Sequence, residues 1–321
     1  MHSVRLTGAT MGTTYNLTLV SETQIDNPSA LQAEVDGVLK ALNQQVSTYI
    51  PDSEINRLKQ RPINEWLDIS TSMEDVLSVS LTVSDWSAGA FDVTLRPLID
   101  LWGFGPSESL DQVPASKAVD DALSRIGFEH LRLDTEQHKL MRTAAVDLDF
   151  SAVAKGYGVD RVASVVEQHG ITNYLLEIGG EIRLRGRNAK GKVWTVAVER
   201  PQDSLSQQVY KAIALTDIAM ATSGDYRNYF EQDGERYSHT IDPRTGRPIV
   251  HNLASVTVLH SSAAMADALA TAFNVMGVEQ ARPLANSKGI AALFIIKTES
   301  GFSELASDAF KPYLSSAVVA P

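Results

Sequence analysis

The sequence predicts an α+β fold in which largely antiparallel sheets are flanked by helices. Alternating, β-branched segments follow one another as hairpin-like clusters, which indicates that neighbouring strands run antiparallel. Longer segments between these clusters have the 3.6-residue periodicity of amphipathic helices. The 321 residues are enough for one large domain or two ordinary ones, and they contain no solenoid repeat, low-complexity tract or evident linker.

The predicted elements alternate along the whole chain. Strands are expected at Val4–Thr10, Thr13–Ser21, Leu131–Leu133, Lys139–Arg142, Val146–Phe150, Tyr174–Ile178, Glu181–Arg187, Val193–Glu199, Val209–Leu215, Ile218–Ser223, Arg236–Ile241 and Ile290–Ile296. Helices are expected at Pro28–Val46, Ser70–Trp86 and Val278–Leu284. A short helix is expected to start near Asp52, and a longer one to run from a Ser151 cap to about His169. The polar residues 106–118 are expected at the surface, and residues 226–230 are expected to connect two strands.

The segment 261–277 is expected to form a central, buried helix. Ser261 or Ser262 can cap its first turn by accepting a hydrogen bond from a backbone N–H group. Gly277 can end it in the left-handed conformation, which costs other residues a Cβ clash. Almost every residue between these ends is apolar, which is typical of a helix buried on all sides.

Three polar residues share one face of this helix, because the spacing of Asp267, Thr271 and Asn274 is four and then three. A buried carboxylate is costly unless it is paired or binds a metal. A carboxylate and a hydroxyl one turn apart, with no Cys or His nearby, suit a hard cation such as Mg²⁺. A metal or phosphate site and a structural polar stripe both remain open on these grounds.

The composition excludes several classes of function. A net charge of −11 argues against a nucleic-acid-binding surface, which would be basic, although a local metal ion could still attract an anionic ligand. The absence of cysteine excludes disulfides, zinc thiolates, iron–sulfur clusters and Cys nucleophiles, and it leaves the compartment open. No segment is long and apolar enough to span a membrane, and no signal peptide is visible.

The segment Asp149–Gly158 is a second candidate site, because a strand is expected to deliver Asp149 to the start of a helix. The free N–H groups and the positive dipole end of that helix favour an anion. Lys155 adds a full charge, while Gly156 and Gly158 would let another group approach the backbone. The phosphate-binding pattern GxxxxGK[ST] and a convincing dinucleotide GxGxxG pattern are both absent. A capped helix with an exposed lysine is the alternative.

His239 precedes a turn, Asp242–Gly246, near the end of a predicted strand. An imidazole is near its pKa at neutral pH, so His239 could act as a general base. A purely structural histidine is the alternative.

Walls for a flat heterocycle could come from Tyr49, Phe91, Trp102, Phe104 and Gly179-Gly180, each of which could equally be an ordinary core or turn residue.

Taken together, these stretches resemble the ApbE family of FAD:protein FMN transferases over nearly the whole chain. The landmarks are Thr10-Met11-Gly12-Thr13, Ser47-Thr48-Tyr49, Gly89-Ala90-Phe91-Asp92, Asp149-Phe150-Ser151-Ala152-Val153-Ala154-Lys155-Gly156, Gly179-Gly180, His239-Thr240-Ile241-Asp242-Pro243-Arg244-Thr245-Gly246 and Ala266-Asp267-Ala268-Leu269-Ala270-Thr271-Ala272. Each is weak alone, but all of them in this order are specific. The resemblance implies a single, T-fold-like α+β domain over residues 1–321 with two intimately packed subdomains.

The resemblance also implies an activity. Members bind FAD and Mg²⁺, split the pyrophosphate, move FMN onto a Thr or Ser hydroxyl of an acceptor flavoprotein subunit and release AMP. Typical acceptors are subunits of sodium-translocating NADH:quinone reductase and of Rnf-type complexes. One alternative is an FAD pyrophosphatase that hydrolyses FAD to FMN and AMP, and another is a non-catalytic flavin-binding protein.

The motifs carry the family's functional residues onto this chain. The metal ligands implied are the side chains of Asp267 and Thr271 and the backbone carbonyl of Ala152. The residues implied to line the FAD site are Met11, Tyr49, Ala90, Phe91, Asp92, Asp149, Lys155 and Ile241. His239 is the residue expected to activate the acceptor hydroxyl.

The family further implies a location on the periplasmic or cell-envelope side, because most members act outside the cytoplasm, often as lipoproteins. This sequence has no cysteine to carry a lipid. Membrane association is therefore expected only through a leader or lipid anchor that the sequence does not contain.

Overall fold

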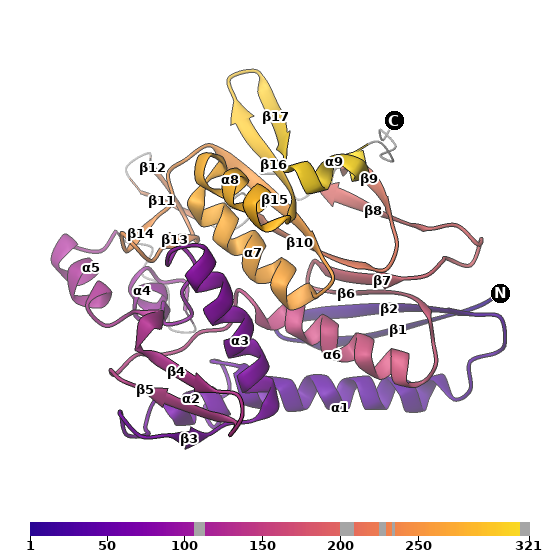
Figure 1. Cartoon of the computed structure of the whole chain (residues 1–321), viewed down its shortest axis with the longest axis horizontal. Coiled ribbons are helices and arrows are strands. Elements are labelled where there is room, and N and C mark those ends of the chain that lie inside the picture. The colour runs from indigo at the N-terminus through magenta and orange to yellow at the C-terminus, as the bar shows by residue number, and fades with distance from the viewer. Residues whose placement is uncertain (106–112, 200–208, 225–228, 233–234, 315–321) are drawn as a thin grey trace.

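The computed structural model describes residues 1–105, 113–199, 209–224, 229–232 and 235–314. Its helices are α1 (Pro28–Val46), α2 (Glu54–Leu58), α3 (Thr71–Trp86), α4 (Arg96–Leu101), α5 (Ser116–Leu123), α6 (Ala154–Gln168), α7 (Ala263–Met276), α8 (Val278–Lys288) and α9 (Lys311–Leu314), with short 3-10 helices η1 (Phe128–His130) and η2 (Asp308–Phe310). Figure 1 shows these helices distributed around one large sheet, as expected for an α+β fold.

The main sheet contains eight strands, and every pairing within it is antiparallel. In spatial order these strands are β1 (His2–Thr10), β2 (Thr13–Ser21), β6 (Asn173–Ile178), β7 (Glu181–Arg185), β10 (Ile218–Gly224), β15 (Leu253–His260), β16 (Ala291–Thr298) and β17 (Gly301–Ala306). The predicted antiparallel character is therefore confirmed.

Smaller sheets surround the main one. They are β3 (Leu67–Asp68) with β5 (Lys139–Arg142) and β4 (Leu131–Asp134), β8 (Trp194–Glu199) with β9 (Val209–Leu215), β11 (Tyr229–Gln232) with β12 (Glu235–Ser238), and β13 (Ile241–Asp242) with β14 (Arg247–Pro248). The predicted surface stretch at 106–118 and connection at 226–230 lie partly outside the described residues, and α5 already begins at Ser116.

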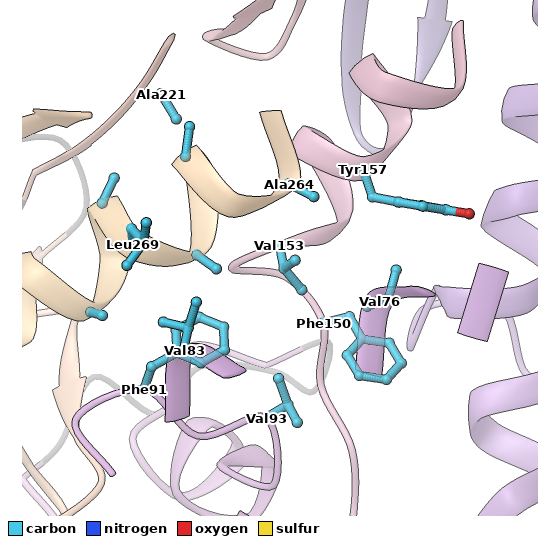
Figure 2. Close-up of a cluster of buried hydrophobic side chains, with 14 of the residues drawn as sticks. Val76, Val83, Phe91, Val93, Phe150, Val153, Tyr157, Ala221, Ala264 and Leu269 are labelled. Carbon is cyan, nitrogen blue, oxygen red and sulfur yellow. The ribbon is translucent and has the colours of Figure 1, made fainter. Parts of the chain in front are cut away.

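The central strands of the sheet are covered on both faces. The largest core cluster joins α3, α6 and α7 to β15 and β16, while a second cluster packs the β8–β9 hairpin and η2 against the opposite face. β15 and β16 are accordingly buried over almost their whole length. Figure 2 shows side chains of the first cluster, among them Phe91, Phe150, Val153 and Leu269, where α3, α6 and α7 converge.

α7 is the central helix that the sequence predicted. Ser262, not Ser261, caps it by accepting a hydrogen bond from the Met265 N–H at 3.2 Å. Gly277 ends the helix with φ 71° and ψ 163°. The positive φ agrees with the prediction, but this ψ lies outside the left-handed helical region and leads the chain directly into α8.

Three predicted elements differ from the structure. Val146–Phe150 is not a strand, because its neighbour is the loop after α3 and the only bridge between them is Leu95 with Asp147. Four of its five residues are buried and only Asp147 is partly exposed, so its burial does not alternate as in a strand with one solvent face. Ser151 does not cap α6, which begins at Ala154 with no side-chain cap. The predicted strand Arg236–Ile241 is split between β12 and β13.

The N-terminus of α7 is held by Asp160 of α6. One carboxylate oxygen accepts hydrogen bonds from the Ala263 N–H at 3.0 Å and from Arg183 at 2.6 Å. The other accepts from the Ala264 N–H at 3.0 Å and the Ser262 hydroxyl at 2.7 Å. A negative group here satisfies the unpaired N–H groups of the helix and complements its dipole.

Replacing Asp160 with alanine is therefore expected to lower the free energy of unfolding by about 3 kcal/mol, because Arg183 and the helix N–H groups lose a charged partner. Urea unfolding followed by circular dichroism would measure this change. Asp85→Ala is the matched control, because Asp85 is exposed near the end of α3. Equal stability of the two variants would show that Asp160 does not anchor α7.

Candidate active site

A cavity of 390 Å³ brings together residues that are far apart in the sequence. Its walls come from the loop after α3, the segment that leads into α6, the end of β10, the segment around β13 and one face of α7. Of the twelve predicted site residues, these ten line it: Ala90, Phe91, Asp92, Asp149, Ala152, Lys155, His239, Ile241, Asp267 and Thr271. One cavity thus unites four of the seven landmark motifs.

Met11 and Tyr49 do not line this cavity. Met11 lies in the β1–β2 turn with a positive φ of 50°, and its side chain packs against the two core clusters that flank α6. Its Cε atom lies close to Gly158 of α6. Tyr49 follows α1 and is 68% exposed. The exposed ring of Tyr49 is available to stack on a ligand. For both Met11 and Tyr49, a role in FAD binding rests on the family resemblance alone.

Asp267 is a deeply buried charge of the cavity. It is 6% exposed, and one of its carboxylate oxygens accepts a hydrogen bond from the Gly156 N–H at 2.9 Å. Burial raises the pKa of Asp267, although the nearby Lys155 and the Gly156 N–H act in the opposite direction. The start of α6 therefore binds a carboxylate of the protein itself through a backbone N–H group.

The polar face of α7 points inward instead of to solvent. Thr271 lines the cavity one turn after Asp267, and Asn274 is fully buried with its side-chain N–H₂ directed at the Thr240 hydroxyl, 3.4 Å away. The Oδ1 atom of Asn274 has no hydrogen-bond partner among the described residues. Asp267 and Thr271 therefore line the cavity, and Asn274 is buried against Thr240, so the polar face of this helix is not a stripe exposed to solvent.

The two loops that carry Asp92 and Asp149 brace each other. The Asp149 N–H donates to the Val93 carbonyl at 2.7 Å, and Asp149 accepts from the Ser151 N–H at 2.8 Å. One oxygen of Asp92 accepts from the Thr94 N–H and hydroxyl, both at 2.7 Å, and the other accepts from the Phe128 N–H at 3.0 Å. Both oxygens of Asp92 are thus used within the protein, so its contribution is to shape the loop.

Lys155 forms a buried ion pair with Glu181, the first residue of β7. The Lys155 Nζ atom lies 2.5 Å from a carboxylate oxygen of Glu181, and Glu181 is only 4% exposed. Burial and the nearby Asp267 raise the pKa of Glu181. Burial lowers the pKa of Lys155, but Asp267 and Glu181 outweigh it and raise that pKa. The ammonium charge is therefore held between two carboxylates at the cavity wall.

His239 lies in the bend between β12 and β13, where the predicted strand is interrupted. Its ring contacts Phe104 edge to face, with centroids 6.4 Å apart. The turn that follows is fixed by an ion pair between Asp242 and Arg244 at 2.8 Å and by the buried Trp102, whose indole N–H donates to the Gly246 carbonyl at 2.8 Å. A rigid turn thus holds His239 at the cavity.

The sequence analysis did not select Glu181, nor Thr222 and Ser223 at the end of β10, as site residues. All three line the cavity. Glu181 carried a signal that could have been used, because this glutamate directly follows Gly179-Gly180, a pair that the sequence analysis had already selected. The β10 residues carried none, because an ordinary strand end contains similar residues.

The donors at the cavity fit a magnesium ion. No group of three or more His, Asp or Glu side chains that could hold a metal occurs in the described part of the chain. Asp267 and Thr271 nevertheless provide hard oxygen atoms beside Ala152. Mg²⁺ is typically bound by one or two carboxylates together with substrate phosphates and water, so a sparse oxygen set of this kind suits it better than zinc or iron.

The comparisons with known proteins identify the family. The sequence matches the ApbE family over residues 11–294, and the chain belongs to this family. It is 46% identical over 314 residues to an FAD:protein FMN transferase of Vibrio cholerae, covering 97% of this chain and 93% of that protein. The FAD:protein FMN transferase of Haemophilus influenzae is 40% identical, with 96% of this chain and 90% of that protein covered.

Solved structures extend the similarity to the fold. The flavin transferase ApbE from Vibrio cholerae superposes with a TM-score of 0.90 at 43% identity, over 97% of this chain and 99% of that one. The apo form of the flavinyl transferase ApbE from Pseudomonas stutzeri superposes with a TM-score of 0.89 at 38% identity, over 99% and 98% of the two chains. The ApbE architecture predicted from the motifs is therefore confirmed.

Proposed function

We propose that this protein is an FAD:protein FMN transferase that moves FMN from FAD to a Thr or Ser hydroxyl of an acceptor flavoprotein subunit. The observation that carries the proposal is the convergence of Asp267, Thr271, Lys155 and His239 on one cavity. Such a site combines oxygen donors for a cation, a positive charge for phosphate and a candidate base. The family membership and the names of its relatives support the same activity.

The reaction is a displacement at phosphorus. The acceptor oxygen bonds to the phosphorus of the FMN half, and the bond from that phosphorus to the bridging oxygen breaks, so AMP leaves with the bridging oxygen. The hydroxyl proton passes to His239. Positioning and charge neutralisation supply most of the catalysis in phosphoryl transfer, so the protein does not need a covalent intermediate.

A bound Mg²⁺ ion would supply neutralisation of the charge that develops on the phosphate oxygens. Asp267, Thr271 and the Ala152 carbonyl are the groups that would hold it. Lys155 would add a fixed positive charge, which Glu181 orients. Phe91 and Ile241 are buried side chains at the cavity that can contact a heterocycle.

We infer the acceptor class and the compartment from the family resemblance. The acceptors proposed are the flavin-bearing subunits of a sodium-translocating NADH:quinone reductase or an Rnf-type complex, on the periplasmic or cell-envelope side. None of the helices among the described residues is long and apolar enough to cross a membrane. Immunodetection of the protein in separated periplasmic and cytosolic fractions would test the compartment.

The activity is tested by incubating the protein with FAD, Mg²⁺ and a Thr-containing fragment of such a subunit. In-gel flavin fluorescence and intact mass should show one added FMN, and the label should disappear when the acceptor Thr is replaced with Ala. Cleavage of FAD without labelling would instead indicate an FAD pyrophosphatase or a different acceptor. Bound FAD that is neither cleaved nor transferred would contradict catalysis.

Replacing His239 with alanine is expected to slow FMN transfer by about 10²–10⁴-fold, the usual contribution of a general base. FAD affinity should change much less, because the proton is removed only in the transition state. Single-turnover labelling and FAD titration would measure the two effects. His169→Ala is the control, because His169 lies at the surface in a pair with Glu34. Unchanged transfer in the His239 variant would remove it as the base.

A further inference from the structure

A second cavity, of 640 Å³, adjoins the candidate active site. It lies among the ends of β2, β6, β7, β8 and β10, and it shares Lys155, Glu181 and Thr222 with the first cavity. The buried ion pair between Lys155 and Glu181 therefore belongs to the walls of both cavities. A ligand in the second cavity would lie next to the groups assigned to phosphoryl transfer.

The lining of the second cavity differs in kind from that of the first. Its described lining contains no aromatic ring, and Lys155 is the only predicted FAD or metal residue that it includes. It offers instead the hydroxyls of Thr13 and Thr14 and the exposed backbone of Gly180, whose Cβ position is open space, while the Gly180 N–H and the Asn16 amide N–H₂ both donate to the Glu177 carboxylate in the same wall. Hydroxyls, a carboxylate and an exposed backbone suit an extended polypeptide better than a flat heterocycle, which prefers apolar and aromatic walls.

Glu181 marks the point where the two cavities meet. One of its carboxylate oxygens accepts the hydrogen bond from Lys155, while the other is buried with no hydrogen-bond partner among the described residues. A buried acceptor without a partner is costly, and such atoms are normally satisfied by a ligand or by water. A hydrogen-bond donor arriving through the second cavity would satisfy it.

We propose that the second cavity binds the segment of the acceptor protein that carries the hydroxyl to be flavinylated, with another hydrogen-bond donor of that segment reaching the unpaired oxygen of Glu181 and the hydroxyl itself directed at His239. The proposal rests on the FMN transferase activity proposed above, which requires a second, protein substrate. The first cavity is assigned to FAD by its residues, and the shared Lys155–Glu181 wall is where the two substrates would meet.

The test places a tryptophan side chain in the second cavity from either of two strands that line it. Ala197→Trp on β8 and Thr14→Trp on β2 both replace exposed residues that line it, so folding should tolerate them. Thr195→Trp is the matched control, because Thr195 is exposed on β8 two residues from Ala197 and does not line the cavity. Transfer to the quinone-reductase fragment would be measured as a function of fragment concentration, and FAD affinity by titration.

Both cavity variants are expected to raise the KM for the fragment by about tenfold or more through steric exclusion, with FAD affinity unchanged. The control should match the wild type. Weakened FAD binding in the cavity variants would assign the cavity to FAD and overturn the proposal, as would an unchanged KM for the fragment. Failure of the wild-type protein to label the fragment would count against the proposed function itself, so the two failures are distinguishable.

Discussion

Replacing Asp267 with asparagine is expected to lower FMN transfer by about 10³-fold while leaving the fold intact. The interaction lost would be the carboxylate contact with the proposed Mg²⁺ ion, which would neutralise the phosphate oxygens, and a contribution of about 4 kcal/mol corresponds to three orders of magnitude in rate. The asparagine oxygen can still accept the hydrogen bond from the Gly156 N–H. Since burial raises the pKa of Asp267, its charge is unfavourable in the metal-free protein, whose stability should therefore not fall.

The metal assignment has a readout that does not depend on turnover. Ligand at 100 times its Kd stabilises a folded protein by about 2.7 kcal/mol. The wild-type protein should therefore melt at a higher temperature with Mg²⁺ and FAD than with FAD and EDTA, and the Asp267→Asn variant should lose that difference. Asp68→Asn, a change at an exposed carboxylate, is the control. Wild-type transfer by the Asp267 variant would refute the assignment.

Replacing Gly156 with alanine is expected to destabilise the fold by about 3 kcal/mol and to reduce transfer as well. A Cβ atom at this position would lie 2.3 Å from the Ala263 carbonyl oxygen and 2.7 Å from the Asp267 Cβ atom. The first of these is backbone and cannot rotate away, so α6 and α7 would have to move apart. That movement would also displace Asp267, whose carboxylate is bonded to the Gly156 N–H.

The same substitution at Gly37 is expected to stabilise the fold instead of destabilising it. Gly37 lies inside α1, and a Cβ atom there would meet nothing within 4 Å. Alanine should therefore raise the free energy of unfolding by about 0.5–1 kcal/mol, because it removes the entropic cost of glycine in a helix. Urea unfolding of the two variants would check both signs. Similar effects at both positions would show that the helices are not in tight contact at Gly156.

Much of the site could be predicted because its residues lie in short, local motifs. Asp267 and Thr271 are one turn apart on a single helix, and Ala152 and Lys155 share one segment, so their proximity follows from local geometry. The start of α7 was similarly predictable, since Ser262 caps it as side-chain chemistry dictates, whereas the predicted Ser151 cap of α6 was wrong. The extension of the site to Met11 and Tyr49, and the division into two subdomains, stay predictions.

The sequence by itself determined the α+β class, the buried central helix, the family and ten of the residues that line the cavity, because periodicity, caps and motifs act over a few residues. Only the tertiary structure decided that Glu181 pairs with Lys155 and that a second cavity adjoins the first. It also replaced the predicted strand at Val146–Phe150 by a loop braced against residues 93–95. These features depend on contacts between segments that are far apart in the sequence. The pattern of apolar, polar and charged residues within one segment does not reveal which other segment packs against it.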